Sequence, residues 1–514
     1  MKTIASRRLS TQLQSNGSQE PFDVFLGRYR ETLRRLFHVD GDFDALSLKR
    51  GLPEDVLNEI MACNPLSTCI PTEYGGRGGR IHESLAMLAA SSYESLALSL
   101  TFGINWALFL QPLAKYGRDE IKGSIFRRFL QEQNMGGLMI TEPDHGTDAL
   151  NMQTSFTEKG THYHLQGVKH WGGLTGIANY WLLTARRRVN SQSLNRDIDF
   201  FICHADCPGQ EIVVEKLFDN LGLYLIPYGH NRIDIKVPKA QRLEPQTSGI
   251  KMMLDLLHRS RMEFPGMGTG FLKRLLDEAL AHCKKRFVGG KSLFKYDQVQ
   301  HRLARMQAAF TVGSALCSHS SNETAIANDL SGRGIEANAI KSVLTDIMHE
   351  SAQSLLQLVG AKGYRLDHVA GRSTVDSRSF QIFEGSNDVL YSQISEAMFK
   401  LMRRAKEKNL FQFLRSFSLT ERASEYFKDV LNFEVDLKLP QRKLVELGRV
   451  LGRIISLEIV LRLGDQGFRR DLIAGCLTTL RQEIDGLLSV HAFANSTVVV
   501  DEYEENSSWL RFVS

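Results

Sequence analysis

Apolar residues recur along this chain with two different periods, and the period changes twice. From about residue 22 to 135 the spacing is helical, with long apolar stretches such as SLALSLTFGINWALFLQPLAKYG. From about 136 to 245, short runs rich in β-branched and aromatic residues, such as NYWLLTARR and DIDFFICHA, predict strands. In one of them Ile233, Ile235 and Val237 alternate with polar residues, which predicts one buried face. Helical spacing then returns for most of the remaining chain.

Two apolar stripes in this last part predict helices that pack against other helices. The first has the i, i+3, i+4, i+7 spacing of a broad helix face suited to a bundle; its residues are Leu272, Leu275, Leu276, Ala279, Leu280 and Cys283. The second comprises Leu447, Val450, Leu451, Ile454, Leu457 and Leu461. Beside it, Gly448 and Gly452 form a GxxxG pattern, which in an apolar helix suggests packing inside a membrane. We predict close helix packing in water instead, because the pattern is interrupted by Arg449, Arg453 and Arg462.

Composition excludes several classes of protein. A chain of 514 residues predicts three or four domains. Its 63 basic and 58 acidic residues are too balanced for a nucleic-acid-binding protein, and no apolar run reaches the length of a membrane span. Seven scattered cysteines favour a reducing compartment. Cys203, His204 and Cys207 lie together, but the alternation around them indicates a strand, so we expect no metal.

The N-terminus, MKTIASRRLSTQLQSNGSQE, is basic, rich in serine and without acidic residues until Glu20. It lacks the apolar segment of a secretory signal. We expect a disordered leader and a cytoplasmic protein. A mitochondrial transit peptide, and hence a matrix protein, is the alternative.

One carboxylate stands out as candidate chemistry. Glu384, in FEGSND, follows the apolar residues Phe380, Ile382 and Phe383. Apolar surroundings raise the pKa of a carboxylate towards the range in which a general base works best. Gly385 permits a tight bend that would leave Glu384 facing a cavity. The alternative is that Glu384 only caps the following helix.

Motifs in a fixed order place this carboxylate in a family context. From about residue 25 to 400 they resemble the acyl-CoA dehydrogenase family of flavoproteins. The segments that carry the resemblance are IPTEYGG (70–76), LMITEPDHGTD (138–148), VKHWGG (168–173), the stretch from Arg286 to Gln298 around GGKSL, QLVGAKGY (357–364) and IFEGSND (382–388).

The resemblance implies a mainly α fold with a central β-barrel. We expect a leader (1–21), an N-terminal α-helical domain (22–135), a middle β-barrel domain (136–245), a C-terminal four-helix bundle domain (246–402) and an additional helical domain (403–514). The last segment lies beyond the common core of the family. We predict that it packs on the bundle and covers a surface that smaller relatives use for tetramer contacts.

The resemblance also implies a reaction, the FAD-dependent oxidation of an acyl-CoA thioester to the trans-2-enoyl-CoA. Glu384 would remove the α-proton, and its N–H would help to stabilise the thioester oxygen. In part of the family the base lies on the helix near residue 260, but this chain has Ser260 there, directly before Arg261. The implied substrate contacts are Thr101, Thr147, Arg261 and Gly385.

The implied FAD contacts fall into two groups. Around the flavin ring they are Ile140, Thr141, Gly146, Thr147, Trp171 and Gly173. Trp171 would form a flat wall beside the ring, unless it is a core residue. Towards the pyrophosphate and adenosine they are Arg286, Gln298, Gln357, Gly360 and Ala361, with Ser386 and Asp388 beside the adenosine segment. An arginine fork suits phosphate oxygens. In the family this second group serves a flavin held mainly by a neighbouring subunit. That arrangement implies a homo-oligomer, for which we expect a dimer rather than a tetramer.

Departures from the family pattern leave the substrate and the electron acceptor open. Gly173 stands where the family usually has Ser or Thr. Either Thr175 replaces the missing hydroxyl, or the hydrogen bond comes from the backbone alone. The second glycine of a pair is Ala361, the usual Phe is displaced in RFVGG, and His145 replaces a small residue. An electron-transfer flavoprotein or another acceptor would reoxidise the flavin. The alternatives are a carrier-protein-bound acyl substrate, oxygen as acceptor, or a flavin-binding scaffold protein. A nicotinamide cofactor is disfavoured because no GxGxxG occurs in a βαβ context.

Overall fold

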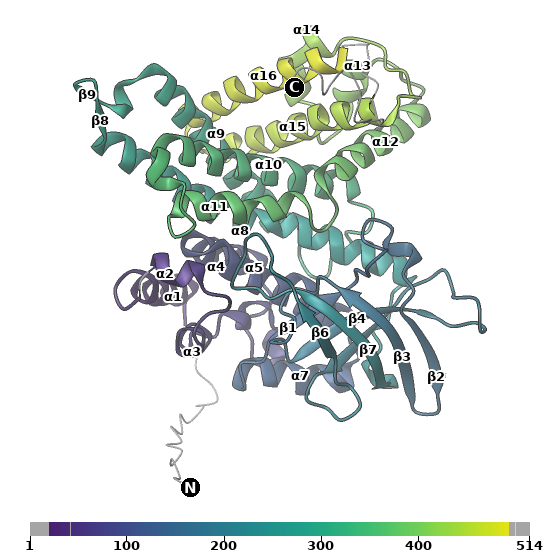
Figure 1. The fold of residues 1–514 in the computed structure, drawn as a ribbon. Coiled ribbons are helices and arrows are strands. Elements are labelled where there is room, and N and C mark those ends of the chain that lie inside the picture. Colours follow the sequence, from purple (N-terminus) through teal and green to yellow (C-terminus); the bar gives the residue numbers. More distant parts are fainter. Residues whose placement is uncertain (1–19, 42, 493–498, 500–514) are drawn as a thin grey trace, which may run out of the picture.

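The computed structural model describes residues 20–41, 43–492 and 499 (Figure 1). Of the predicted leader only residues 20 and 21 fall within this range, and the acidic tail DEYEENSSW lies outside it. The fold class is confirmed: the chain is mainly α-helical, with one sheet in the middle of the sequence.

The N-terminal part is helical, as its apolar spacing predicted. The helices are α1 (Phe22–His38), α2 (Phe43–Leu48), α3 (Glu54–Ala62), α4 (Ile81–Glu94), α5 (Leu96–Asn105), α6 (Gln111–Tyr116) and α7 (Asp119–Gln131). In the described residues, one stretch, Leu96–Tyr116, is long and apolar enough to cross a membrane, with a mean hydropathy of 1.4. Its apolar window is 94% buried inside the fold, which is the environment of a core helix.

The middle part forms one curled sheet. Its strands are β1 (Gly136–Met139), β2 (Ser155–Lys159), β3 (His162–His170), β4 (Tyr180–Arg187), β5 (Asp199–His204), β6 (Val213–Leu217) and β7 (Gly229–Pro238). They pair in the order β1-β4-β2-β3-β7-β6, and β5 pairs with β4. Ile233, Ile235 and Val237 are buried on β7 and their polar neighbours are exposed, as predicted. In the described residues the outermost strands do not pair with each other, so the sheet is an open half-barrel.

The next part is a bundle built around one long helix. Its elements are α8 (Gly249–Lys285), β8 (Phe287–Val288), β9 (Lys291–Ser292), α9 (Asp297–Glu323), α10 (Gly334–Val359), α11 (Val369–Arg378) and α12 (Asn387–Ala405). Helix α8 packs against α4, α9 and α10. The predicted stripe on α8 is buried, with Leu280 only partly so.

The described part of the C-terminal segment contains α13 (Leu410–Leu414), α14 (Lys428–Leu431), α15 (Gln441–Asp465) and α16 (Arg470–Ala492). Helix α15 packs on α9, α10 and α12, and α16 packs on α9 and α15 (Figure 1). The close approach predicted for the GxxxG pattern is present, since a Cβ atom on Gly448 would lie 2.1 Å from the backbone oxygen of Tyr391.

Candidate active site

The loop between α11 and α12 holds the predicted base in an unusual backbone conformation. We call residues 383–387 the Glu384 turn. Glu384 has φ +53° and Gly385 has φ +93°. A left-handed conformation is uncommon for a residue other than glycine, and it persists only where its surroundings enforce it. The turn is therefore a built feature, and its supports show how it is held.

Two buried cations hold the carbonyl groups of this turn. Arg261 Nε on α8 donates to the oxygen of Glu384 at 3.0 Å, and Lys341 Nζ on α10 donates to the oxygen of Gly385 at 2.9 Å. The two residues are only 7% and 0% exposed. Burial lowers the pKa of both side chains, and that of Lys341 falls to about 7. The turn is fixed from two helices that are far apart in the sequence.

The Glu384 carboxylate has one oxygen fixed and one free. Ser260 Oγ donates to Oε1 at 2.7 Å, whereas Oε2 is buried without a hydrogen-bond partner in the described residues. The rings of Phe264, Phe380 and Phe383 pack together around the turn, with centroids 4.9–5.9 Å apart. Burial raises the pKa of Glu384, although the Ser260 hydrogen bond and the charges of Arg261 and Lys341 oppose the rise. A carboxylate with raised proton affinity and a free oxygen is suited to proton abstraction.

A second buried carboxylate, which the sequence analysis missed, lies on the same helix. Glu263 Oε1 accepts a hydrogen bond from Gln111 Nε2 at 2.8 Å. Within the described chain, Glu263 Oε2 and Gln111 Oε1 are buried without partners. Burial raises the pKa of Glu263 to about 7. A protonated Glu263 carries the donor that Gln111 Oε1 lacks, so we assign it as a neutral acid. The sequence feature that could have identified Glu263 is an acidic residue within the apolar stretch MEFPGM (262–267).

The predicted flavin-edge segment follows β1 and is held from behind. Glu142 forms a buried ion pair with Lys169 at 3.0 Å and accepts a hydrogen bond from the N–H of Thr154 at 2.9 Å. The Thr141 oxygen accepts from the N–H of His170 at 2.8 Å. Ile140 and Thr141 are half-buried, and Gly146 and Thr147 are exposed. A Cβ atom on Gly146 would meet no other atom within 4 Å. The segment therefore presents backbone and small side chains outwards on a rigid support.

Trp171 lies directly after β3, beside this segment. Its side chain is 51% exposed and packs against Phe218 and Tyr228, with ring centroids 4.6 and 5.9 Å away. The core interpretation of Trp171 is therefore wrong, and a flat apolar face is available to a ligand. Thr101, by contrast, is buried on α5, where its hydroxyl donates to the Ala97 oxygen at 3.1 Å.

The departure at Gly173 has a steric reason. A Cβ atom there would lie 2.7 Å from Ile104 Cδ1, so a Ser or Thr would need Ile104 to move. The suggestion that Thr175 supplies the missing hydroxyl is wrong. The Thr175 hydroxyl is buried, donates to the Gly172 oxygen at 2.7 Å and accepts from Asn231 Nδ2 at 3.2 Å. A hydrogen bond from position 173 itself to a ligand would have to come from the backbone.

The predicted pyrophosphate and adenosine residues lie far from the Glu384 turn. Arg286 is 26 residues after Ser260, which at 1.5 Å per residue is about 40 Å along α8. Arg286 and Lys362 line an open groove of about 360 Å³ at this end of the bundle. Gln298, Gln357, Gly360 and Ala361 are exposed and are not part of the groove lining. This separation fits the expectation that these residues serve a cofactor bound mainly by another subunit.

The remaining predicted residues lie at the start of α12. Ser386 is half-buried and directly precedes the helix. Asp388 Oδ1 accepts a hydrogen bond from Arg449 Nη2 of α15 at 3.0 Å. The C-terminal segment thus reaches a residue four positions after the predicted base.

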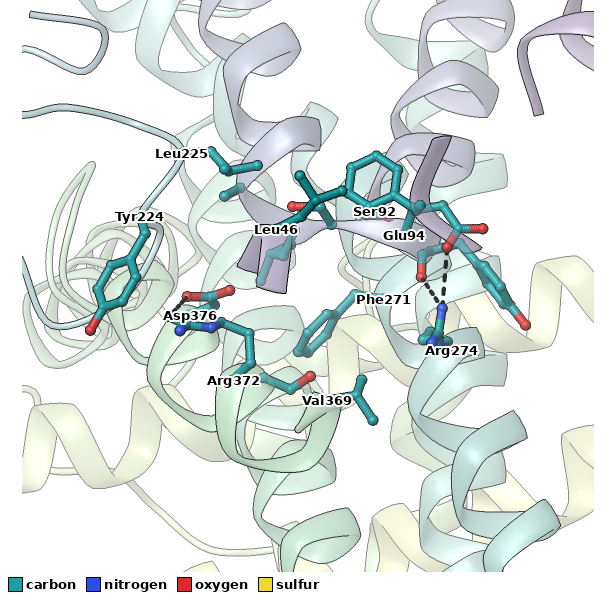
Figure 2. A pocket seen from close by; sticks show the side chains of 16 residues that line it. Leu46, Ser92, Glu94, Tyr224, Leu225, Phe271, Arg274, Val369, Arg372 and Asp376 are labelled. Atoms are coloured by element: carbon teal, nitrogen blue, oxygen red, sulfur yellow. Dashed lines mark hydrogen bonds and ion pairs between the residues drawn. The ribbon is translucent and has the colours of Figure 1, made fainter. Parts of the chain in front are cut away.

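A small pocket of about 40 Å³ lies between α5, α8 and α11, and Figure 2 shows Arg372 beside Asp376 on one side of it. None of the predicted site residues lines this pocket. Asp376 accepts a hydrogen bond from the N–H of Leu223 at 2.6 Å, and the Arg372 guanidinium lies 4.2 Å from the ring centroid of Tyr224. These contacts fix α11, the helix before the Glu384 turn, to the loop before β7.

Comparisons with known proteins agree along most of the chain. Family models described as the N-terminal, middle and C-terminal domains of acyl-CoA dehydrogenase match residues 29–133, 137–234 and 247–399. An acyl-CoA dehydrogenase of Bacillus subtilis is 25% identical over 332 residues, which is 62% of this chain and 83% of that protein. A glutaryl-CoA dehydrogenase of Desulfococcus multivorans is 25% identical over 329 residues, covering 63% of this chain and 82% of its own.

Solved structures show the same fold. A Bacillus anthracis acyl-CoA dehydrogenase complexed with FAD has a TM-score of 0.76 at 18% identity, over 94% of this chain and 90% of its own. A butyryl-CoA dehydrogenase of Megasphaera elsdenii has a TM-score of 0.64 at 21% identity, over 75% of this chain and 100% of its own. Residues 403–514 make up about a fifth of this chain. A match over 94% of the chain, as with the Bacillus anthracis structure, therefore includes most of these residues.

Proposed function

Because this chain belongs to the acyl-CoA dehydrogenase family, we propose that it oxidises an acyl-CoA thioester to the trans-2-enoyl-CoA with FAD as cofactor. The observation that carries the proposal is the Glu384 carboxylate. Its Oε1 is fixed by Ser260, and its Oε2 is buried and free to take a proton.

The Glu384 turn supplies two functions for this reaction. Glu384 Oε2 removes the α-proton of the thioester, and its raised pKa makes it a stronger base than a solvated carboxylate. That proton is too weakly acidic unless the developing charge on the thioester oxygen is stabilised. The N–H of Glu384 makes no hydrogen bond within the described residues, so it is available to donate to that oxygen. A preoriented donor of this kind is typically worth about 3 kcal/mol in the transition state.

The residues present fit FAD. The exposed face of Trp171 and the outward backbone of 141–147 suit a flat ring with a polar edge. The groove with Arg286 and Lys362 suits the pyrophosphate of a cofactor from a second copy of the chain. When bound, FAD would accept the β-hydrogen as hydride. This arrangement supports a homo-oligomer in which each site contains residues of two chains.

The test is anaerobic titration of the purified protein with a panel of acyl-CoAs, following the loss of flavin absorbance. We expect the wild type to be reduced by at least one acyl-CoA. Glu384→Gln should retain FAD and lose reduction by at least about 100-fold, the typical cost of removing a general base. Glu263→Gln is the matched control, because it removes the other buried carboxylate of the site and should stay within about tenfold of the wild type. Near wild-type reduction of Glu384→Gln would overturn the assignment.

A different acyl carrier or electron acceptor is the alternative function. One support for it is that Gly173 provides no side-chain hydroxyl at a position where the family usually has one. A second is that a prolyl acyl carrier protein oxidase has the same fold, with a TM-score of 0.67 at 18% identity over 75% of this chain and 100% of its own. Titration with the same acyl groups on a carrier protein, and oxygen uptake with each, separates these activities from transfer to an electron-transfer flavoprotein. A flavin that no thioester bleaches would support a scaffold protein.

A further inference from the structure

The buried ammonium of Lys341 donates to the Gly385 carbonyl of the Glu384 turn rather than to the Glu384 carboxylate. Lys341 Nζ donates to the Gly385 oxygen and to Asn387 Oδ1, both at 2.9 Å. Burying an ammonium group costs several kcal/mol of desolvation free energy unless its hydrogen-bond partners compensate for it. By these two bonds Lys341 joins the Gly385 carbonyl to the side chain of Asn387, the first residue of α12.

Beyond Asn387 the hydrogen bonds continue into α10. Asn387 Nδ2 donates to Asp346 Oδ1 at 2.7 Å, and the Tyr391 hydroxyl donates to Asp346 Oδ2 at 2.7 Å. Asn387 and Tyr391 are four residues apart on one face of α12. Asp346 therefore fixes the first turn of that helix at both ends, using both of its oxygens.

The outer side of the same helical turn is covered by the C-terminal segment. A Cβ atom on Gly448 of α15 would lie 2.1 Å from the backbone oxygen of Tyr391, and one on Gly452 would lie 3.3 Å from its ring. The backbone of α15 therefore packs directly against α12 at Tyr391. Arg453, almost fully buried beside Tyr391 and Asp346, donates from Nε to Glu483 Oε2 of α16 at 2.8 Å. Figure 1 shows α15 and α16 stacked over this side of the bundle.

We propose that the hairpin of α15 and α16 braces the Glu384 turn through Tyr391, Asp346, Asn387 and Lys341. Tyr391 and Lys341 are then positioning residues for the base. Such a brace is required because the left-handed backbone conformation of Glu384 persists only where the surrounding structure enforces it. The kinetic part of this inference rests on the proposed function, whereas the structural part does not.

Charges from three elements meet at Lys341. Arg261 faces it from α8, Asp346 from α10 and Glu384 from the turn. Removing the Lys341 charge takes away one of the two cations that lower the pKa of Glu384. A variant without this charge should need a higher pH to ionise the base.

The first test measures amide hydrogen exchange across residues 382–388 in the holoenzyme. Tyr391→Phe removes only the hydroxyl that donates to Asp346, and we expect roughly tenfold faster exchange in the turn. Tyr29→Phe is the matched control, since the buried Tyr29 hydroxyl pairs with Ser91 Oγ at 2.7 Å in the N-terminal helices. It should leave exchange in the turn unchanged. Equal exchange in the two variants would overturn the brace.

The second test is kinetic. Tyr391→Phe should lower kcat by roughly tenfold with KM unchanged, because the base is displaced while substrate contacts remain. Lys341→Met should also move the midpoint of the kcat–pH profile upwards, and Tyr29→Phe should change neither. A loosened turn with wild-type kcat would overturn the positioning role. If no thioester reduces the wild type, the proposed function fails, and the exchange comparison of the two tyrosine variants still decides the brace.

Discussion

Replacing Glu263 with glutamine should make the protein more stable at alkaline pH. The carboxylate is buried, and its pKa is raised from 4.5 to about 7. Between these two pH values the unfolded chain ionises while the folded chain keeps its proton, so the wild type loses stability as pH rises through this range. A glutamine has no such loss. It can still accept from Gln111 Nε2 and can donate to Gln111 Oε1, which is unpartnered in the described residues.

The magnitude follows from the size of the shift. About 2.5 pKa units at 1.36 kcal/mol each give about 3 kcal/mol at pH values above 7, and almost nothing below 4.5. Thermal unfolding midpoints of wild type and Glu263→Gln at pH 5 and 8.5 measure this difference. We expect nearly equal midpoints at pH 5 and a higher midpoint for the variant at pH 8.5.

A control distinguishes a neutral acid from an ion-paired one. Glu83 is also fully buried, but its Oε2 lies 2.7 Å from Arg77 Nε. Glu83→Gln leaves the buried Arg77 without the carboxylate of its ion pair, and breaking a buried ion pair typically costs about 3–5 kcal/mol. It should lower the midpoint at pH 8.5. If Glu263→Gln behaved in the same way, Glu263 would be ionised in the folded protein and our assignment would be refuted.

Two further predictions concern the C-terminal segment. Gly448→Ala should destabilise the protein strongly, because the new Cβ atom would lie 2.1 Å from the backbone oxygen of Tyr391. The matched control is Gly475→Ala, on the open surface of α16, which should be neutral or stabilising by up to about 1 kcal/mol. Thermal unfolding of the two variants measures the difference. A chain truncated near residue 404 should expose the apolar face under α15 and aggregate or change its oligomeric mass by light scattering. A soluble truncated protein with the same number of chains per assembly and full activity would contradict the covering role and the expected dimer.

The sequence was informative where a property is local. Alternation at Ile233, Ile235 and Val237 identified a half-buried strand, and the stripe from Leu272 to Cys283 identified a bundle helix, since each pattern depends only on neighbouring residues. The strand order could not be predicted, because β1 and β2 both pair with β4 although β3 lies before β4 in the sequence, and helical and strand spacing do not show which strands pair. The sheet also remained open where a barrel was expected.

The same limit explains what was missed in the site. Glu384 was identifiable because its surroundings, Phe380, Phe383 and Gly385, adjoin it in the sequence. Glu263 depends on Gln111, 152 residues earlier, and the Gly385 carbonyl is held by Lys341, 44 residues earlier. Helical spacing cannot show which distant side chain meets a given face. It therefore could not indicate that Glu263 forms no ion pair within the described residues or that Lys341 contacts the turn.

The most direct test of the central claim follows the α-proton itself. Incubating the anaerobic holoenzyme with a reactive acyl-CoA in deuterated water reports exchange at the α-carbon, independently of the electron acceptor. We predict exchange in the wild type and in Glu263→Gln, and at least a 100-fold loss in Glu384→Gln with FAD still bound. Exchange in Glu384→Gln at the wild-type rate, or its loss only in Glu263→Gln, would contradict the assignment of Glu384 as the base.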